Sequence, residues 1–266
     1  MDIRKYNREA WDRSVDEGNE FTIPVSSEII QAARLGDWRI CLTQMLPVPR
    51  DWFPENLEGL DILCLASGGG QQGPVLAAAG ANVTILDNSP KQLAQDRMVA
   101  DRDGLELRTI EGDMADLSMF QKESFDIIVN PVSNVFAPHV LPIWYECYHV
   151  LRYGGVLMTG FMNPVYYLFD LPLLEDKGVL KVKYKLPYSD LTSTTEEERQ
   201  QYLEKGWPLE FSHSLDEQIG GQLKVGFVLT GFFEDHDPRS EIREYMPVYI
   251  ATRAVKIKDS FSSFKV

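Results

Sequence analysis

The sequence predicts a doubly wound α/β fold, in which a seven-stranded, mostly parallel sheet carries helices on both faces. Two observations support this prediction. From residue 61 onward, short apolar segments alternate with segments of helical periodicity, which is the pattern of a parallel sheet covered on both sides. The first apolar segment, 62–65, also runs into a glycine-rich turn and an alanine-rich helix, as buried strands of such folds do.

Residues 1–59 are expected to form a helical appendage ahead of the sheet, and residues 60–266 the main domain. Aromatic residues are spread through the appendage and prolines interrupt it, so only short helices and loops are predicted there. The appendage is expected to pack on the main core, to act as a lid over a site, or to do both.

The remaining strands are predicted from apolar segments that follow one another at regular intervals. They are 83–86, 105–110, 125–129, 156–161, 227–233 and 245–254. A helix is predicted to begin after Ser89, because a serine N-cap followed by Pro90 is a helix-start signal, and to end at Gly104. Apolar residues at helical spacing predict a further helix that ends at the turn 152–155.

The regular alternation lapses between about residues 163 and 213. The strand-like fragment 179–186 and the polar run 192–201 predict an insertion of one or two strands and a helix. Ser214 and Glu217 then form a capping box that starts a helix to about Val225. Because ligands of doubly wound folds bind outside the carboxyl ends of the strands, the insertion and the appendage are expected to select the substrate.

Composition and charge narrow the range of partners. The chain has 266 residues and a formal net charge of −14, from 26 Lys and Arg against 40 Asp and Glu. Such a charge repels a phosphate backbone, so no nucleic-acid partner is expected.

The three cysteines, Cys41, Cys64 and Cys147, have neither disulfide nor zinc-site spacing, so no metal is expected. With no signal peptide and no bilayer-length apolar run, we expect a cytoplasmic protein without a membrane partner. The oligomeric state is not indicated.

The glycine turn predicts a nucleotide-type ligand. Gly68, Gly70 and Gly73 have the G-x-G-x-x-G spacing of dinucleotide-binding turns, and Asp87 follows Gly68 by 19 residues at the end of the second predicted strand. A carboxylate at that place accepts hydrogen bonds from the ribose hydroxyls of any nucleoside. These two motifs alone therefore leave an NAD-dependent oxidoreductase open.

The later strand ends distinguish between these ligands. Gly112-Asp113-Met114, the strand 125–129 and the turn 150–155 follow the glycine turn and Asp87 in the order found in one family. Over about residues 60–162 the sequence resembles the class I S-adenosylmethionine-dependent methyltransferases, particularly the type 11 group. The resemblance implies a Rossmann-like methyltransferase fold, an enzyme that transfers a methyl group, and S-adenosylmethionine as cofactor.

The resemblance also implies a contact for each part of the cofactor. The glycine turn holds the methionine part, the acid after the second strand binds the ribose, and the Gly-Asp pair meets the adenine. The candidate cofactor-binding residues are therefore Ala66, Ser67, Gly68, Gly70, Asp87, Asn88, Gly112, Asp113, Met114 and Asn130. Asn130-Pro131 matches only the start of the Asn-Pro-Pro-aromatic motif of nitrogen methyltransferases, so it assigns no acceptor chemistry, and ordinary turn chemistry explains it equally well.

Two positions depart from the family pattern. An acidic residue usually stands two positions before the first glycine of the turn, where it helps to orient the glycine loop and the cofactor. Here Cys64 occupies that position and Ala66 replaces the first glycine. Tyr153 replaces a proline in the turn 150–155, which affects only a turn.

The candidate substrate site lies in the loops after the fourth and fifth strands. His139 is the candidate general base, with a helix-start histidine bonded to backbone or solvent as the alternative. Tyr166 and Tyr167 are expected to line an aromatic pocket or to serve in packing. The candidate substrate-binding residues are Trp11, Ser133, Phe136, His139, Tyr166 and Tyr167.

These observations predict an S-adenosylmethionine-dependent methyltransferase with a small-molecule acceptor. A phenol, a carboxylate or an amine of low pKa needs no base, whereas a hydroxyl or a protonated amine needs one. A non-catalytic nucleoside-binding protein is the alternative from a different class, and a nucleic-acid methyltransferase is disfavoured by the acidic charge.

Overall fold

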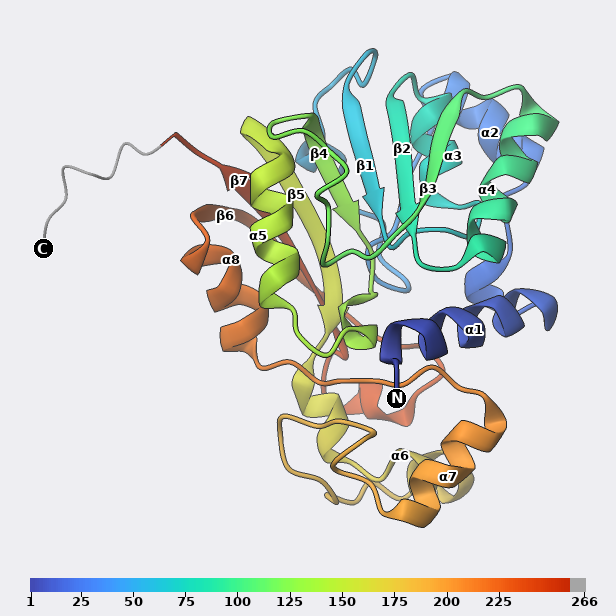
Figure 1. The fold of residues 1–266 in the computed structure, drawn as a ribbon, viewed down its shortest axis with the longest axis vertical. Coiled ribbons are helices and arrows are strands. Elements are labelled where there is room, and N and C mark those ends of the chain that lie inside the picture. The colour runs from blue at the N-terminus through green and yellow to red at the C-terminus, as the bar shows by residue number, and fades with distance from the viewer. Residues whose placement is uncertain (259–266) are drawn as a thin grey trace, which may run out of the picture.

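The computed structural model describes residues 1–258, which contain one seven-stranded sheet in the order β3-β2-β1-β4-β5-β7-β6. Strands β1 to β5 pair in parallel, and β7 runs antiparallel to both of its neighbours, β5 and β6. Helices cover both faces of the sheet, and a lobe containing α6 and α7 lies below the carboxyl ends of the strands in the view of Figure 1. The predicted doubly wound α/β fold is confirmed.

The bounds of the elements are as follows. The strands are β1 Asp61–Leu65, β2 Asn82–Asp87, β3 Leu107–Glu111, β4 Phe125–Asn130, β5 Leu151–Met162, β6 Phe227–Asp235 and β7 Tyr249–Lys256. The α-helices are α1 Ile3–Asp16, α2 Ser27–Arg34, α3 Gln72–Ala78, α4 Pro90–Asp103, α5 Leu141–Val150, α6 Leu171–Lys177, α7 Glu196–Lys205 and α8 Gly221–Lys224. Short helical turns are η1 Glu20–Thr22, η2 Arg50–Trp52, η3 Asn134–Phe136, η4 Pro164–Leu168, η5 Asp216–Gly220 and η6 Glu241–Glu244.

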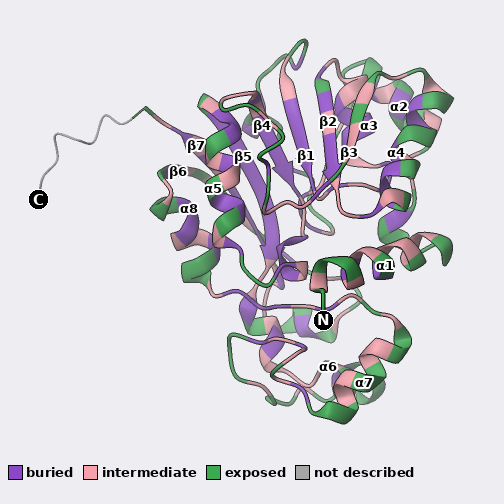
Figure 2. Cartoon of the chain, in the orientation of Figure 1, coloured by how far each residue is buried: buried purple, intermediate pink, exposed green. Residues whose placement is uncertain are grey.

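The hydrophobic core has two parts, one on each face of the sheet. Successive residues of β1 point to opposite faces. Ile62 and Cys64 pack in the part that contains residues of α2, α3 and α4, whereas Leu63 and Leu65 pack in the part that contains residues of α5. Figure 2 shows the central strands buried along most of their length, with exposed residues on the outer sides of the helices. The apolar run 62–65 is therefore buried on both faces.

Strand β5 is longer than the sequence predicts. The segment 152–155 was expected to form a turn, but β5 begins at Leu151, directly after α5, and Gly154 adopts a φ of 85° within it. Arg152 donates to Asp61 Oδ2 at 2.8 Å and to Asp126 Oδ2 at 2.7 Å. These contacts hold the start of β5 against the starts of β1 and β4. Leu151 pairs with Phe125 and Val156 with Ile127, so residues 152–155 form an irregularity in the pairing between β4 and β5.

The strand predicted at residues 179–186 of the insertion is absent, so this prediction is wrong, and the segment is irregular. Residues 179–186 belong to no strand and form one isolated bridge, between Phe169 and Val182. Val182 is 65% exposed, because no neighbouring sheet covers the apolar side chains that alternate with lysines in this segment. The predicted helix is present as α7, which begins with a capping box formed by Thr195 and Glu198. A second helix, α6, precedes it.

The first 59 residues contain α1 and α2, which occupy different places. Ile30 and Ala33 of α2 belong to the core on one face of the sheet. Helix α1, with Asp2 as its N-cap, crosses the carboxyl ends of the strands between the sheet and the lobe of α6 and α7 (Figure 1). No helix within residues 1–258 is long and apolar enough to cross a membrane.

Candidate functional site

A cavity of about 1860 Å³ lies at the carboxyl ends of the parallel strands. Its wall is formed by strand ends, by α1, by residues 37–44 and by the insertion. Residues 66–68 and Asp87 line one part, which we call the glycine-turn end. Tyr166, Tyr167 and Glu210 line another part, which we call the tyrosine end. One cavity is thus lined by most of the predicted cofactor residues and by the predicted substrate residues.

Carboxylates of the protein hold the backbone amides of the glycine turn. Gly68 N donates to Asp87 Oδ2 at 2.8 Å. Gly69 N and Gly70 N donate to the two carboxylate oxygens of Asp96 at 3.2 and 2.9 Å. The backbone amides of these three glycines are therefore held by acceptors of the protein itself.

Asp96 supplies the acidic side chain that the sequence lacks at Cys64. Asp96 lies on α4 and has no exposed surface. Burial, reinforced by the neighbouring Asp87 carboxylate, raises the pKa of Asp96. Burial and the charge of Asp96 likewise raise the pKa of the Cys64 thiol. A signal for Asp96 was present in the sequence, because it falls between Leu93 and Ala100 on the apolar face of the helix.

Asp87 and Ser67 both line the cavity at the glycine-turn end. Asp87 Oδ1 accepts from Ser89 N at 2.9 Å, and burial raises the pKa of Asp87 despite its backbone hydrogen bonds. The Ser67 hydroxyl is buried and has no hydrogen-bond partner within residues 1–258. Such a hydroxyl fits a polar group of a ligand, because a buried polar atom without a partner is costly.

The Gly112-Asp113-Met114 segment continues the cavity wall beyond β3. A Cβ atom at Gly112 would lie 3.0 Å from a methyl group of Leu86, so only glycine fits there without displacement. Asp113 Oδ1 accepts from Ala115 N at 2.9 Å, and Met114 Sδ lies 3.8 Å from Ser133 Oγ. The side chains of Asp113 and Met114 are half-buried.

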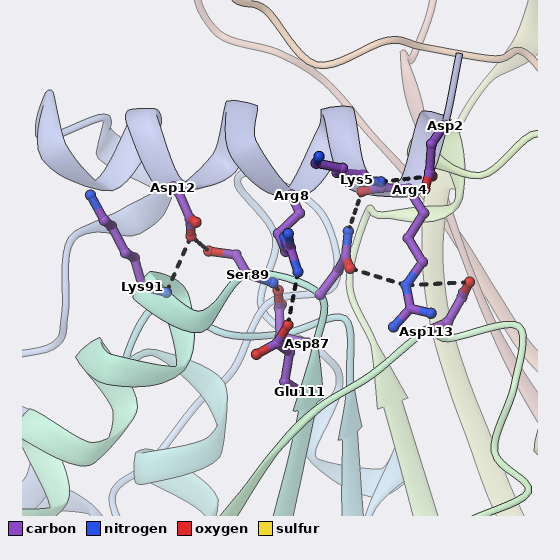
Figure 3. A network of polar contacts seen from close by, with 11 residues as sticks. Asp2, Arg4, Lys5, Arg8, Asp12, Asp87, Ser89, Lys91, Glu111 and Asp113 are labelled. Carbon is purple, nitrogen blue, oxygen red and sulfur yellow. Dashed lines mark hydrogen bonds and ion pairs between the residues drawn. The ribbon is translucent and has the colours of Figure 1, made fainter.

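Helix α1 is fastened over this end by polar side chains, as Figure 3 shows. Arg4 Nε donates to Asn88 Oδ1 at 3.2 Å, Asn88 Nδ2 donates to the Arg4 carbonyl at 2.8 Å, and Arg4 Nε lies 3.8 Å from Asp113 Oδ2. Further along the helix, Arg8 pairs with Glu111 at 3.2 Å. Nothing in the local sequence indicates these contacts, because they join residues about a hundred positions apart.

A second part of the same network lies at the far end of α1 (Figure 3). Asp12 Oδ1 accepts from Ser89 Oγ at 2.6 Å and from Lys91 N at 3.2 Å, at the first turn of α4. A carboxylate at that place suits the positive end of the helix. Helix α1 is therefore attached both to the ends of β2 and β3 and to the start of α4.

Two of the predicted cofactor residues do not line the cavity. Gly70 packs beneath the turn, where its carbonyl accepts from Val25 N at 2.9 Å. Asn130 has no exposed surface, since Nδ2 donates to the Leu65 carbonyl and to Ser133 Oγ, and Oδ1 accepts from Thr159. The expected contact between Asn130 and the cofactor is therefore corrected, because the Asn130 amide joins β1, β4 and β5 instead.

The six predicted substrate residues all line the cavity. The Trp11 and Phe136 rings meet edge to face at 5.1 Å, which connects α1 to the loop after β4. Asn7 and His213 support that loop, since Asn7 Nδ2 donates to the Phe136 carbonyl at 3.0 Å and His213 Nε2 lies 2.9 Å from the Ala137 carbonyl. His139 is exposed.

The tyrosine end contains a carboxylate that the sequence did not indicate. Tyr167 donates to Glu210 Oε2 at 2.6 Å, and the Tyr167 ring stacks on Tyr188 at 5.3 Å. Burial raises the pKa of Glu210 to about 7, which the hydrogen bond from Tyr167 opposes and the charge of Asp190 reinforces. Burial and Glu210 raise the pKa of Tyr166 and Tyr167, so both remain neutral near pH 7.

Comparisons with known proteins relate this chain to methyltransferases. Residues 63–159 match the family described as methyltransferase domain. The chain is 53% identical over 252 residues to the uncharacterized methyltransferase YbaJ of Bacillus subtilis, covering 95% of this chain and 98% of that protein.

Two solved structures share the fold. An S-adenosylmethionine-dependent methyltransferase from Mesorhizobium loti has a TM-score of 0.57 at 18% identity, covering 77% of this chain and 94% of that one. The Burkholderia thailandensis 1,6-didemethyltoxoflavin-N1-methyltransferase, solved with 1,6-didemethyltoxoflavin and S-adenosylhomocysteine, has a TM-score of 0.55 at 13% identity, covering 96% and 88%.

Proposed function

Because the chain belongs to the class I S-adenosylmethionine-dependent methyltransferases, we propose that it methylates a small molecule held inside the cavity. The observation that supports this proposal is that α1 and the insertion lie over the strand ends and both contribute residues to the cavity wall. A small acceptor fits such a cavity beside the cofactor. A nucleic acid would need an open and basic surface, whereas the chain is acidic.

The residues at the glycine-turn end fit the cofactor. The unpartnered Ser67 hydroxyl suits the amino-acid part, Asp87 suits the ribose hydroxyls, and Asp113 suits the adenine amino group. S-adenosylmethionine supplies a methyl group that its sulfonium already activates. What the protein adds is alignment and the exclusion of water, and positioning of this kind contributes roughly 7 to 11 kcal/mol in favourable cases.

His139 remains the candidate base from the sequence, and its position in the cavity wall supports a role near the acceptor. The cysteines are free, as suits a reducing compartment, and we place the enzyme in the cytoplasm. A non-catalytic cofactor-binding protein is the alternative. Transfer of radiolabel from S-adenosylmethionine to a metabolite extract would decide against that alternative.

Calorimetry with S-adenosylhomocysteine tests the cofactor assignment. We expect binding to the unaltered protein and a loss of at least about tenfold in affinity for Asp87→Ala, since a charge-assisted hydrogen bond contributes roughly 1.5 to 3 kcal/mol. Asp101→Ala is the matched control, because Asp101 is exposed on α4. Tight NADH binding with no response to S-adenosylhomocysteine would contradict the proposal.

A further inference from the structure

The tyrosine end is built around one carboxylate among aromatic rings. The Tyr167 hydroxyl donates to Glu210 Oε2. The Tyr166 ring stands perpendicular to the Tyr167 ring at 5.4 Å, and the Tyr188 ring stacks on the Tyr167 ring at 5.3 Å. The three tyrosines and Glu210 all line the cavity. They come from η4, from residues 184–190 and from the segment after α7, so the fold brings together three separate stretches of chain here.

Glu210 has no cationic partner among residues 1–258. No ion pair involves it, and no hydrogen bond reaches Oε1, its second carboxylate oxygen. The two lysines that line this part of the cavity are engaged elsewhere. Lys183 pairs with Asp170 and Glu198 at 3.3 and 2.8 Å, and Lys205 lies 4.2 Å over the Trp207 ring. A half-buried carboxylate without a counter-charge is unfavourable unless a ligand supplies one.

Other acidic residues give this end a negative field. Glu175 and Asp176 also line it, and neither forms an ion pair within residues 1–258. Asp190 lies beside Glu210, but both of its oxygens are used, since Tyr188 Oη donates at 2.5 Å and Glu210 N donates at 2.7 Å. An acceptor carrying a carboxylate, a phosphate or a phenolate would be repelled here. A cation would be attracted by this field.

We propose that the methyl acceptor is an amine that binds as its ammonium ion between Glu210 and the rings of Tyr166, Tyr167 and Tyr188. This proposal rests on the proposed methyl transfer and specifies its substrate class. Glu210 would contribute a charge-assisted hydrogen bond through its unpartnered oxygen, and the rings would surround the alkyl part of the amine. The tyrosine hydroxyls remain neutral donors and do not compete as anions.

The same contact prepares the amine for reaction. An ammonium ion has no lone pair, so it must first lose a proton, and Glu210 takes that proton to become a neutral carboxylic acid. The nitrogen lone pair then forms the new bond to the methyl carbon while the carbon–sulfur bond breaks and its electron pair returns to sulfur. The product is a methylated ammonium ion and a thioether, and the proton on Glu210 leaves to solvent.

Three probes of equal size test the charge preference directly. Benzylamine, benzyl alcohol and benzoate are titrated into protein saturated with S-adenosylhomocysteine, and binding is followed by calorimetry. We expect benzylamine to bind at least about tenfold more tightly than benzyl alcohol, and benzoate to bind most weakly. Equal affinities, tighter binding of benzoate, or no binding of any of the three would overturn the proposal.

A matched pair of variants identifies the residue. Glu210→Gln keeps an acceptor for Tyr167 and removes the charge, so the preference for benzylamine over benzyl alcohol should fall to less than about threefold. Glu204→Gln, at an exposed position of α7, should keep the full preference. Retention of the preference in Glu210→Gln would contradict the role of this residue. Binding of S-adenosylhomocysteine by the same samples tests the proposed function separately, because neither variant alters a residue of the glycine-turn end.

Discussion

The buried carboxylates at the two ends of the cavity differ in how many hydrogen bonds they accept from the protein. At the glycine-turn end, Asp87 accepts two backbone hydrogen bonds and Asp96 accepts two more, so each charge is used to order the backbone. At the tyrosine end, Glu210 accepts one hydrogen bond, from Tyr167, and has no ion pair within residues 1–258. The first end is therefore organised before any ligand binds, whereas the second leaves part of its polar capacity for the acceptor.

This difference follows from what builds each end. The glycine-turn end consists of strand ends and the start of a helix, whose backbone amides need partners. The tyrosine end consists of side chains from loops and short helical turns, where a carboxylate has few amides within reach. The comparison predicts that mutations at the first end disturb structure and cofactor together, and that mutations at the second end affect the acceptor and leave the fold intact.

The largest effect is expected for Asp96→Ala. The change removes the carboxylate that accepts from Gly69 N and Gly70 N. Gly69 N keeps the Gln92 carbonyl as an acceptor at 3.0 Å, whereas Gly70 N loses its partner and a small cavity is left in the core. We expect a loss of about 1 to 3 kcal/mol in the free energy of unfolding and a much weaker affinity for S-adenosylhomocysteine. Urea denaturation and calorimetry measure the two quantities, and Asp101→Ala is the control on the same helix.

A double variant separates the position of this acid from its presence. Cys64→Asp combined with Asp96→Ala returns a carboxylate to the strand that enters the glycine turn. We expect it to recover part of the affinity that Asp96→Ala loses, because the two positions are neighbours in the core. If the double variant binds S-adenosylhomocysteine no better than Asp96→Ala, then the acid must stand on α4 and the comparison with the family pattern fails.

The two ends of the cavity also differ in how far their residues could be predicted from the sequence. Asp87 and Asp113 follow apolar strands, and parallel strands bring their carboxyl ends to one edge, so local pattern was sufficient to place them. Glu210 meets Tyr167 across 43 residues, and Asn7 meets Leu209 across 202. Contacts of that separation leave no periodic signal. Asn130 was misplaced for a related reason, because its partner Thr159 lies on the next strand.

The next effect in size is the pH dependence of stability at the tyrosine end. The pKa of Glu210 is raised to about 7 by burial, so the native state binds this proton more tightly than the unfolded chain. Its contribution to the free energy of unfolding is therefore present below about pH 4.5 and is lost as the pH rises through 7. Glu210→Gln lacks that loss, and we expect its stability relative to the unaltered protein to improve by about 1 to 2 kcal/mol between pH 4.5 and 8.

Urea titrations of both proteins across this pH range provide the measurement. The difference between the two curves isolates Glu210, because Asp87 and Asp96 titrate equally in both proteins. A difference that stays constant from pH 4.5 to 8 would contradict a raised pKa. With benzylamine and S-adenosylhomocysteine present, the pH dependence should weaken, since the ammonium ion stabilises the charged form of Glu210.

The smallest effect is expected for Arg4→Ala, which tests whether the glycine-turn end is closed as well as preorganised. Arg4 joins α1 to Asn88 and Asp113 (Figure 3), but its side chain is 52% exposed and its ion pair spans 3.8 Å. Exposed pairs of this kind contribute about 0.5 kcal/mol. We therefore expect association and dissociation rates of S-adenosylhomocysteine to rise about two- to threefold while the Kd changes less, since a looser α1 opens more often.

Stopped-flow fluorescence provides the rates, with Trp11 on α1 as the reporter. Lys5→Ala is the control, because Lys5 is exposed one position further along the same helix. Unchanged rates in Arg4→Ala would mean that α1 is a fixed wall of the cavity, and that both ends of the cavity are reached from the side of the insertion.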